Sequence, residues 1–227
     1  MPRIPNVAVL LAGCGHVDGA EVREAVLTLL ALDQHGAQYQ CLAPDSMQQS
    51  VTDHRTGQPA PGQGRNMLEE ASRIARVGKC LDLAQADPAQ YDALLLPGGA
   101  GVAKNLCSFA LDGPGGAVRA DVRAFVQAFF DQRKPVGAIC IAPALVAMVL
   151  AGQGRRARLT LGADPGVAAA MDQLGARHKA VASAREIVVD DDCNLVTTPA
   201  YMFDDARLSD VWTGIERCVT EVLTRVD

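Results

Sequence analysis

One short stretch, residues 134–150, constrains the fold more than any other part of the chain: K-P-V-G-A-I-C-I-A-P-A-L-V-A-M-V-L. The apolar run 136–139 has the length and β-branched content of a buried strand. A helical pattern begins at Ala142, with proline in its first turn, where proline is tolerated. Cys140 therefore lies on a sharp turn between a strand and a helix. Such a nucleophile elbow needs small neighbours, and alanines stand two positions before and after the cysteine.

The start of the predicted helix favours the reactive form of Cys140. The positive end of a helix dipole and its free N–H groups stabilise a thiolate, which is the nucleophilic form of cysteine. Free cysteine is also among the most buried residue types, so an inert core position is the alternative interpretation. The stretch taken alone leaves both interpretations open.

Short apolar runs alternate with helical patterns along the rest of the chain. Strands are predicted at 7–12, 38–43, 93–96 and 136–139, and helices at 19–34, 66–76, 118–130 and 208–226. Weaker patterns predict a strand at 158–162, a helix at 166–175 and a hairpin of strands 187–190 and 195–198. This alternation is typical of βαβ units. We therefore predict one α/β domain over residues 1–227, a three-layer α/β/α sandwich with a mainly parallel sheet.

Glycine-rich loops follow two of these strands, one at 13–19 and one at 97–101. Binding crevices of parallel sheets lie beyond the carboxyl ends of the strands, so both loops are expected beside Cys140. The N–H groups of Gly98, Gly99 and Ile141 are candidates for an oxyanion hole, because no side chain obstructs the glycines. An isolated P-G-G is more often a plain tight turn. Its position before the elbow favours the functional interpretation.

Glu21 and Glu24 are the candidates for the group that moves protons. Acidic residues also stabilise the first turn of any helix, and that interpretation fits Glu21 better than Glu24. Burial of Glu24 beside Cys140 would raise the pKa of its carboxyl group, which could then donate a hydrogen bond before acting as a base. Only His16 or His54, both on predicted loops, could form a Cys–His dyad with Cys140.

Composition and motifs exclude several classes of function. The four histidines lack metal-ligand spacing, and Cys14 with His16 supplies only two ligands, so we expect no metal. No phosphate-binding loop is present and the dinucleotide fingerprint is incomplete, so we expect no nucleotide cofactor. A net charge of −5 without a Lys/Arg cluster argues against a nucleic-acid partner. The apolar runs are too short to span a membrane.

The cysteines predict the compartment. All seven are scattered without C-x-x-C spacing, their number is odd, and no charged-then-apolar leader is recognised. We therefore expect a soluble protein in the reducing cytoplasm.

Several sequence blocks in fixed order resemble the ElbB family, the glyoxalase-type, isoprenoid-biosynthesis-associated member of the PfpI-like, class I glutamine-amidotransferase-like superfamily. The blocks are A-G-C-G-H-V-D-G-A-E-V-R-E-A-V-L-T-L-L at 12–30, C-L-A-P-D at 41–45, R-N-M-L-E-E-A-S-R-I-A-R at 65–76, L-P-G-G-A-G-V-A-K-N-L at 96–106, K-P-V-G-A-I-C-I-A-P-A at 134–144 and V-T-T-P-A-Y-M at 196–202.

The resemblance implies a flavodoxin-like sandwich and an enzyme that needs neither glutathione nor metal. Such an enzyme would convert glyoxal, or methylglyoxal, into the 2-hydroxy acid. Cys140 would form a hemithioacetal, and the superfamily pattern G-A-E-x-x-E places its carboxylate partner and proton shuttle at Glu24. The N–H groups of Gly99 and Ile141 would hold the enediolate-like intermediate.

The expected pocket is lined by Gly13, Cys14, Gly15 and Asn105, and this small-residue lining fits a two- or three-carbon dicarbonyl substrate. We expect a homodimer by analogy with other proteins that have this sheet. The excursion 44–65 would either contact the second subunit or cover the pocket.

The chain also departs from the superfamily pattern. Residues 161–165 lack the histidine that other branches place after the next strand, and 197–203 lacks the H-x-E of true amidotransferases, which disfavours glutaminase activity. Two other functions remain open. One is a non-catalytic redox-sensing, stress or partner-binding role that uses an oxidisable Cys140. The other, a weaker alternative, is an amidase or peptidase.

Overall fold

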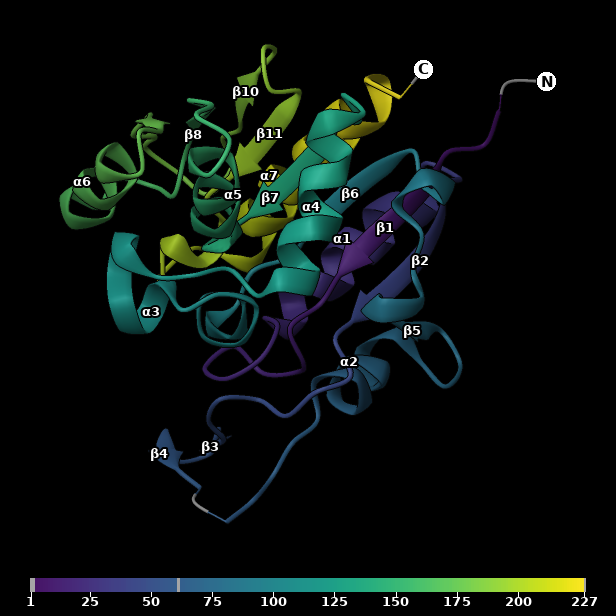
Figure 1. Cartoon of the computed structure of the whole chain (residues 1–227), viewed down its shortest axis with the longest axis vertical. Helices are drawn as coiled ribbons and strands as arrows, with labels where there is room; N and C mark the ends of the chain where they lie inside the picture. Colours follow the sequence, from purple (N-terminus) through teal and green to yellow (C-terminus); the bar gives the residue numbers. More distant parts are fainter. Residues whose placement is uncertain (1–2, 61, 227) are drawn as a thin grey trace.

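The computed structural model describes residues 3–60 and 62–226, and its centre is a seven-stranded sheet in the order β10-β11-β7-β6-β1-β2-β5 (Figure 1). The strands are β1 (Asn6–Leu10), β2 (Gln38–Ala43), β5 (Cys80–Asp82), β6 (Ala93–Leu96), β7 (Val136–Ile139), β10 (Val188–Asp190) and β11 (Leu195–Thr198). Neighbouring strands are parallel except β10, which pairs antiparallel with β11. The predicted mainly parallel α/β sheet is confirmed.

Helices cover both faces of the sheet (Figure 1). One face packs against α1 (Val22–Gln34), α2 (Met67–Ala75) and α7 (Leu208–Thr224), and the other against α4 (Ala120–Asp131) and α5 (Ala142–Ala151). Strand residues alternate between the two cores: Val7 and Val9 join the first, whereas Ala8 and Leu10 join the second. Because both faces are buried, the strands are apolar without alternation.

The amphipathic helix predicted at 118–130 forms as α4, and its apolar face is buried in the second core. Helix α5 is different, because every residue from Ala142 to Leu150 is buried. A helix that is apolar all round needs partners on all sides. Helix α5 has them in β7, α4 and the π-helix at Val102–Leu106.

Several features differ from the sequence-based expectations. The strand predicted at 158–162 forms only over Arg158–Leu159, outside the main sheet, and the strand predicted at 7–12 ends at Leu10. Strand β5, at the edge of the sheet, was not predicted, because its three residues carry no periodic signal. Helix α1 begins at Val22 rather than at residue 19, because Gly15 and Gly19 close a tight loop first. The Gly15 N–H donates to the Ala20 carbonyl at 2.8 Å, and the Gly19 N–H donates to the Gly15 carbonyl at 2.6 Å.

Several short elements lie outside the seven-stranded sheet. The excursion 44–65 contains a short hairpin of β3 and β4, and β8 pairs parallel with β9. Their bounds are β3 (Thr52–Asp53), β4 (Gln58–Pro59), β8 (Arg158–Leu159) and β9 (Arg177–His178), with helices α3 (Phe109–Asp112) and α6 (Pro165–Gln173). In the described part of the chain, no helix is long and apolar enough to cross a membrane.

The order of strands fixes where a site can form. From β1 the chain continues on one side to β2 and on the other, later, to β6, so the gap between β1 and β6 is a topological switch point. The segments after β1, β6, β7 and β11 all leave the same edge, because these strands are parallel. Residues far apart in the sequence therefore meet there.

Candidate active site

Cys140 directly follows β7 and occupies the elbow. Its φ angle of 60° lies in the left-handed region, which side chains other than glycine rarely adopt. The Cys140 N–H donates to the Thr198 carbonyl of β11 at 2.9 Å, which holds the turn against the sheet. The cysteine is 7% exposed, and what remains accessible faces a pocket. Backbone strain of this kind persists only where the surrounding structure enforces it, and it is concentrated at functional sites.

Glu24 lies in the first turn of α1 and is completely buried. Its two carboxyl oxygens accept backbone hydrogen bonds, one from Gly98 at 3.0 Å and one from Tyr201 at 3.2 Å. Burial, followed by the negative charge of Glu21, raises the pKa of Glu24 to about 8. The hydrogen bonds from Tyr201, Cys140 and Gly98 offset only part of this increase.

Cys140 and Glu24 lie side by side against Gly98, where an added Cβ atom would clash with both the Cys140 Cβ atom and the Glu24 Oε2 atom, and each residue changes the pKa of the other. Burial and then the charge of Glu24 raise the pKa of the thiol, whereas the backbone N–H groups of Gly99 and Ile141 lower it. The N–H group at the helix start therefore lowers the pKa of the thiol, as expected, but burial and the Glu24 carboxylate outweigh it, and the pKa of the resting thiol is raised. Two buried acids in contact do not both ionise, so the pair carries at most one negative charge.

The glycines after β6 are required by close packing. A Cβ atom on Gly98 would stand 2.6 Å from the Glu24 Oε2 atom and 2.9 Å from the Ile139 carbonyl oxygen. Gly99 has a φ of 102°, and its N–H reaches the thiol of Cys140. Two N–H groups thus converge on the sulfur from the β6 loop and from the start of α5. This is the arrangement that would stabilise negative charge on an oxygen beside that sulfur.

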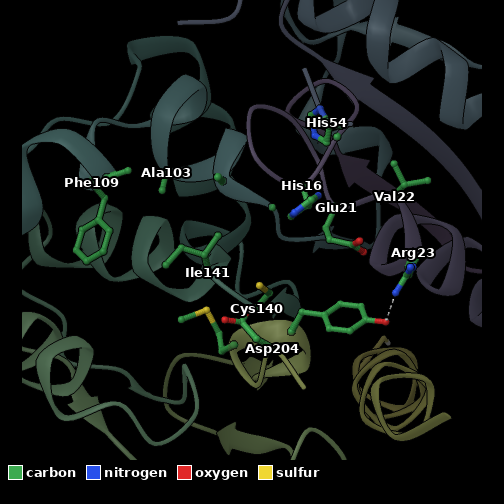
Figure 2. A pocket seen from close by; sticks show the side chains of 16 residues that line it. His16, Glu21, Val22, Arg23, His54, Ala103, Phe109, Cys140, Ile141 and Asp204 are labelled. Carbon is green, nitrogen blue, oxygen red and sulfur yellow. Dashed lines mark hydrogen bonds between the residues drawn. The ribbon is translucent and has the colours of Figure 1, made fainter. Parts of the chain in front are cut away.

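A pocket of about 750 Å³ reaches Cys140 (Figure 2). Polar side chains on one side come from the loop after β1, from the start of α1 and from the excursion 44–65; they are His16, Glu21, Arg23 and His54. Apolar side chains on the other side are Ala103, Phe109, Ile141 and Met202, and the exposed Asp204 also lines the pocket. Arg23 donates a hydrogen bond to the Tyr201 hydroxyl at 3.1 Å, which joins α1 to the segment after β11.

The four residues expected to line the substrate pocket lie in different places. Gly15 lines the pocket that reaches Cys140, and Cys14 lines an adjoining cavity that also contacts Gly15. Gly13 packs against the Gln48 side chain and is not part of the wall. Asn105 is buried behind the loop, where its amide nitrogen donates to backbone carbonyls. Gly13 and Asn105 therefore shape the loop rather than the pocket surface.

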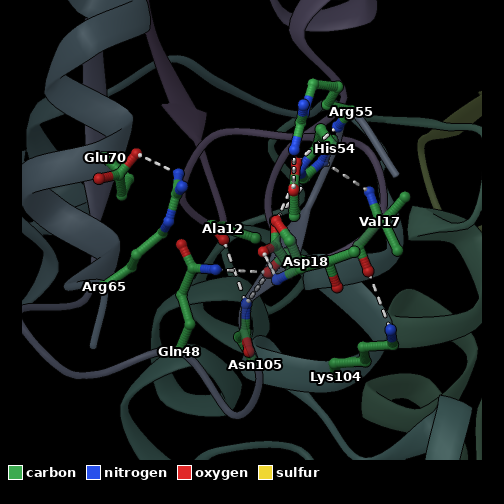
Figure 3. Close-up of polar contacts among 12 residues, drawn as sticks. Ala12, Val17, Asp18, Gln48, His54, Arg55, Arg65, Glu70, Lys104 and Asn105 are labelled. Carbon is green, nitrogen blue, oxygen red and sulfur yellow. Dashed lines mark hydrogen bonds and ion pairs between the residues drawn. The ribbon is translucent and has the colours of Figure 1, made fainter. Parts of the chain in front are cut away.

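Asp18 connects the excursion 44–65 to the loop after β1 (Figure 3). The carboxylate is fully buried; its Oδ2 atom accepts a hydrogen bond from the Thr52 N–H at 2.7 Å, and its Oδ1 atom lies 3.7 Å from His54 Nε2. The rings of His54 and His16 meet edge to face at 5.3 Å. The excursion therefore lies against the pocket and supplies one of its walls, as the second of its two expected roles requires.

Tyr201, Met202 and Phe109 line the pocket but were not predicted from the sequence. The prediction paired 195–198 only in a hairpin, whereas β11 also pairs parallel with β7. That pairing brings the residues after β11 to the same edge as Cys140, and the motif T-T-P-A-Y-M was the available signal. Phe109 carries no such signal, because α3 is a four-residue helix on an irregular segment.

Within residues 3–60 and 62–226, no three His, Cys, Asp or Glu side chains gather in a way that could hold a metal ion. The groups that meet at the end of the pocket are the Cys140 thiol, the Glu24 carboxyl group and the backbone N–H groups. This combination suits nucleophilic addition to a carbonyl carbon with proton transfer inside the pair.

Comparison with known proteins identifies the family to which this fold belongs. The model of the DJ-1/PfpI family matches residues 17–203. A human protein, glutamine amidotransferase-like class 1 domain-containing protein 3, mitochondrial, is 42% identical; the match covers 96% of this chain and 82% of that protein. The family-level part of the predicted resemblance is thereby confirmed.

Solved structures agree. The isoprenoid biosynthesis protein with amidotransferase-like domain from Ehrlichia chaffeensis is 36% identical, with a TM-score of 0.89 over 97% of this chain and 99% of that one. Glyoxalase III from Candida albicans is 14% identical, with a TM-score of 0.64 over 98% of each chain. The second likeness concerns the fold alone.

The predicted cytoplasmic location is wrong by comparison with the relatives. Matching proteins from human, rat and zebrafish are all named mitochondrial. Unpaired cysteines separate reducing from oxidising compartments, but they do not distinguish one reducing compartment from another.

Proposed function

Because this chain belongs to the DJ-1/PfpI family, we propose that it is a cysteine-dependent enzyme that converts glyoxal or a related α-dicarbonyl into the 2-hydroxy acid without metal or glutathione. The observation that carries this proposal is the contact between Cys140 and the buried Glu24 at the end of a pocket. The fold shared with glyoxalase III supports it at the level of architecture only.

In the first step the sulfur of Cys140 adds to an aldehyde carbon. Glu24, in its ionised form, takes the thiol proton as the S–C bond forms, and it returns that proton to the new alkoxide to give a hemithioacetal. The alkoxide lies where the Gly99 and Ile141 N–H groups converge. Donors already in place stabilise this charge without reorganisation, and one such donor in a serine protease contributes roughly 3–4 kcal/mol.

The next steps move hydrogen within the substrate. Glu24 removes the proton from the hemithioacetal carbon, which leaves an enediolate, and the same proton is delivered to the second carbon. One carbon is thereby oxidised to a thioester while the other is reduced to an alcohol, so no outside oxidant is needed. Water then hydrolyses the thioester and releases the 2-hydroxy acid and the Cys140 thiol.

The raised pKa of Cys140 makes the redox-sensing alternative less well supported. Oxidation to sulfenic acid follows thiolate character and exposure, and here the thiol is 7% exposed with an elevated pKa. A carboxylate that deprotonates the thiol only when a substrate arrives suits catalysis better than sensing.

The test is glycolate formation from glyoxal in the presence of EDTA and without glutathione. We expect turnover by the wild type, none by Cys140→Ser, and a loss of about 10²- to 10⁴-fold in Glu24→Gln, the range typical of general acid–base groups. Cys80→Ser and Glu69→Gln serve as matched controls, because both residues lie outside the pocket, and should leave turnover unchanged. An inactive wild type, or an active Cys140→Ser, would contradict the proposal.

A further inference from the structure

The pocket above Cys140 is far larger than glyoxal requires. Its volume is about 750 Å³, within the range of roughly 300–1,000 Å³ typical of sites that enclose drug-sized molecules. Glyoxal is only two joined aldehyde groups and would leave most of this space to water. The size of the pocket indicates a substrate with an additional group.

The lining of the pocket indicates the chemistry of that group. Ala103, Phe109, Ile141 and Met202 form what we call the apolar arm, and they come from the π-helix, from α3, from the start of α5 and from the segment after β11. Figure 2 shows Ala103, Phe109 and Ile141 on one side of Cys140, with the polar side chains His16, Glu21 and Arg23 on the other. The thiol therefore lies between an apolar and a polar region.

The apolar arm is only partly covered by the protein itself. Phe109, Ile141 and Met202 pack against the core with one side and remain half-buried, with their other side toward the pocket. Single exposed apolar residues are ordinary on protein surfaces. Apolar side chains from separate segments that converge beside a nucleophile are typical of a ligand pocket, and a ligand that enters would cover the exposed sides of Phe109, Ile141 and Met202.

We propose that the natural substrate is an α-ketoaldehyde whose ketone carries an apolar aryl or branched alkyl group, and that this group occupies the apolar arm while the aldehyde lies over Cys140. This inference rests on the proposed function. An aryl group would meet the Phe109 ring and the Met202 sulfur, both of which make favourable contacts with aromatic rings. The sulfur adds to the aldehyde carbon, which ends as the carboxylate, while the ketone carbon gains a hydrogen and becomes the alcohol.

The experiment measures alkylation of Cys140, so that it does not depend on turnover. Wild-type protein is treated with 2-bromoacetophenone or with bromoacetone; in each case the sulfur displaces bromide, and mass spectrometry follows the labelled Cys140 peptide. Each rate is divided by the rate of the same reagent with free glutathione. We expect this normalised rate to be at least tenfold higher for 2-bromoacetophenone, because only its phenyl group fills the apolar arm.

Variants of α3 identify the apolar arm as the cause. Phe109→Ala should lower the rate for 2-bromoacetophenone about tenfold and change that for bromoacetone less than twofold. Ala110→Trp, at an exposed position on the rim of the pocket, tests the same point by blocking the arm without disturbing the core. Leu111→Ala is the matched control, because this neighbour on α3 is 59% exposed and does not line the pocket. Equal normalised rates for the two reagents, or equal effects of Phe109→Ala on both, would overturn the inference.

Turnover of phenylglyoxal and glyoxal separates this inference from the proposed function. We expect kcat/KM to be at least tenfold higher for phenylglyoxal, and the ratio to collapse in Phe109→Ala. If neither compound is turned over while the alkylation preference persists, the proposed function fails and the apolar arm stands as a binding site for aryl ketones. If glyoxal is turned over without any preference for the phenyl compounds, the inference fails and the proposed function stands.

Discussion

The reactive pair shows how two ordinary residues acquire unusual properties through contact. Glu24 is buried under Gly98 and Tyr201, and burial raises the cost of charging it, whereas the Cys140 thiol partly offsets that cost. Cys140 is itself buried, and the charge of Glu24 raises the cost of charging the thiol further. The N–H groups of Gly99 and Ile141 act in the opposite direction and stabilise negative charge at the sulfur. The Cys140 thiol therefore keeps its proton until a carbonyl carbon is present to react with the sulfur.

The pKa of Glu24 predicts the pH dependence of reactivity. Below pH 8 the carboxyl group is largely protonated and cannot accept the thiol proton, so alkylation of Cys140 by iodoacetamide should accelerate as pH rises through about 8. In Glu24→Gln this acceleration near pH 8 should disappear. The measurement is the labelling rate of the Cys140 peptide from pH 6 to pH 9.5. An unchanged profile in Glu24→Gln would show that another group controls the thiol.

The same carboxyl group predicts how stability varies with pH. The folded protein holds the Glu24 proton up to about pH 8, whereas the unfolded chain releases it near the ordinary value of 4.5. The free energy of unfolding should therefore fall as pH rises from 4.5 to 8, at up to about 1.4 kcal/mol per pH unit from this group. Urea denaturation of wild type and Glu24→Gln across this window measures the difference. A variant with the same slope as the wild type would contradict the assignment.

Gly98 is the residue on which the geometry of the pair depends most directly. Gly98→Ala would force a Cβ atom toward Glu24 Oε2 and the Ile139 carbonyl, at 2.6 and 2.9 Å. We expect a loss of about 2–4 kcal/mol of stability, together with loss of turnover. Thermal unfolding measures the first effect. Gly115→Ala is the matched control, because a Cβ there meets nothing within 4 Å, and it should shift stability by less than about 0.5 kcal/mol.

At the scale of elements, strands and helices bring the site residues to one edge of the sheet, and the loops at that edge set the geometry of the pocket. The π-helix Val102–Leu106 ties the β6 loop to the β1 loop: Lys104 donates to the Val17 carbonyl at 2.9 Å and Asn105 to the Asp18 carbonyl at 2.8 Å. Short π-helical segments are often found at functional sites. Here the segment fixes one loop of the pocket and contributes Ala103 to its wall.

Asp18 should control the order of the excursion 44–65. Asp18→Ala removes the acceptor of the Thr52 N–H and the carboxylate beside His54, and it leaves a buried donor unpaired at a cost of about 1–3 kcal/mol. Hydrogen–deuterium exchange should therefore accelerate in peptides that cover residues 48–60. Asp164→Ala, which removes the N-cap of α6, is the control, and its effect should be confined to α6. Unchanged exchange at 48–60 would contradict the role of Asp18.

At the scale of the whole molecule, two cores share a single sheet, and we predict one cooperative unit of unfolding. Cys107 is buried in the core on the α4 side and Cys218 in the core on the α7 side. Because every central strand contributes to both cores, the two thiols should become alkylated at the same urea concentration. Pulsed alkylation followed by mass spectrometry measures both midpoints in one sample. Two separate midpoints would show that the faces unfold independently and would contradict the single domain.

The sequence alone determined most of the architecture. Strands β6 and β7 match the predicted 93–96 and 136–139, and the elbow at Cys140 follows from the strand-to-helix pattern. Short-range periodicity and turn chemistry specify these elements, because each depends on neighbours in the chain. The choice of Glu24 and of the Gly99 and Ile141 N–H groups also came from the sequence, and the structure brings them to Cys140. The Gly98 N–H, expected in the same oxyanion hole, instead donates to Glu24 Oε2.

Only the tertiary structure decided the properties that depend on burial and on distant neighbours. The pKa values of Glu24 and Cys140, the contribution of Tyr201, and the clamp between Asp18 and the excursion 44–65 all come from contacts across the chain. The apolar arm likewise joins four segments that no local pattern relates. Desolvation and cavity shape are set by the packing of the whole molecule, so they cannot be predicted from any one stretch of sequence.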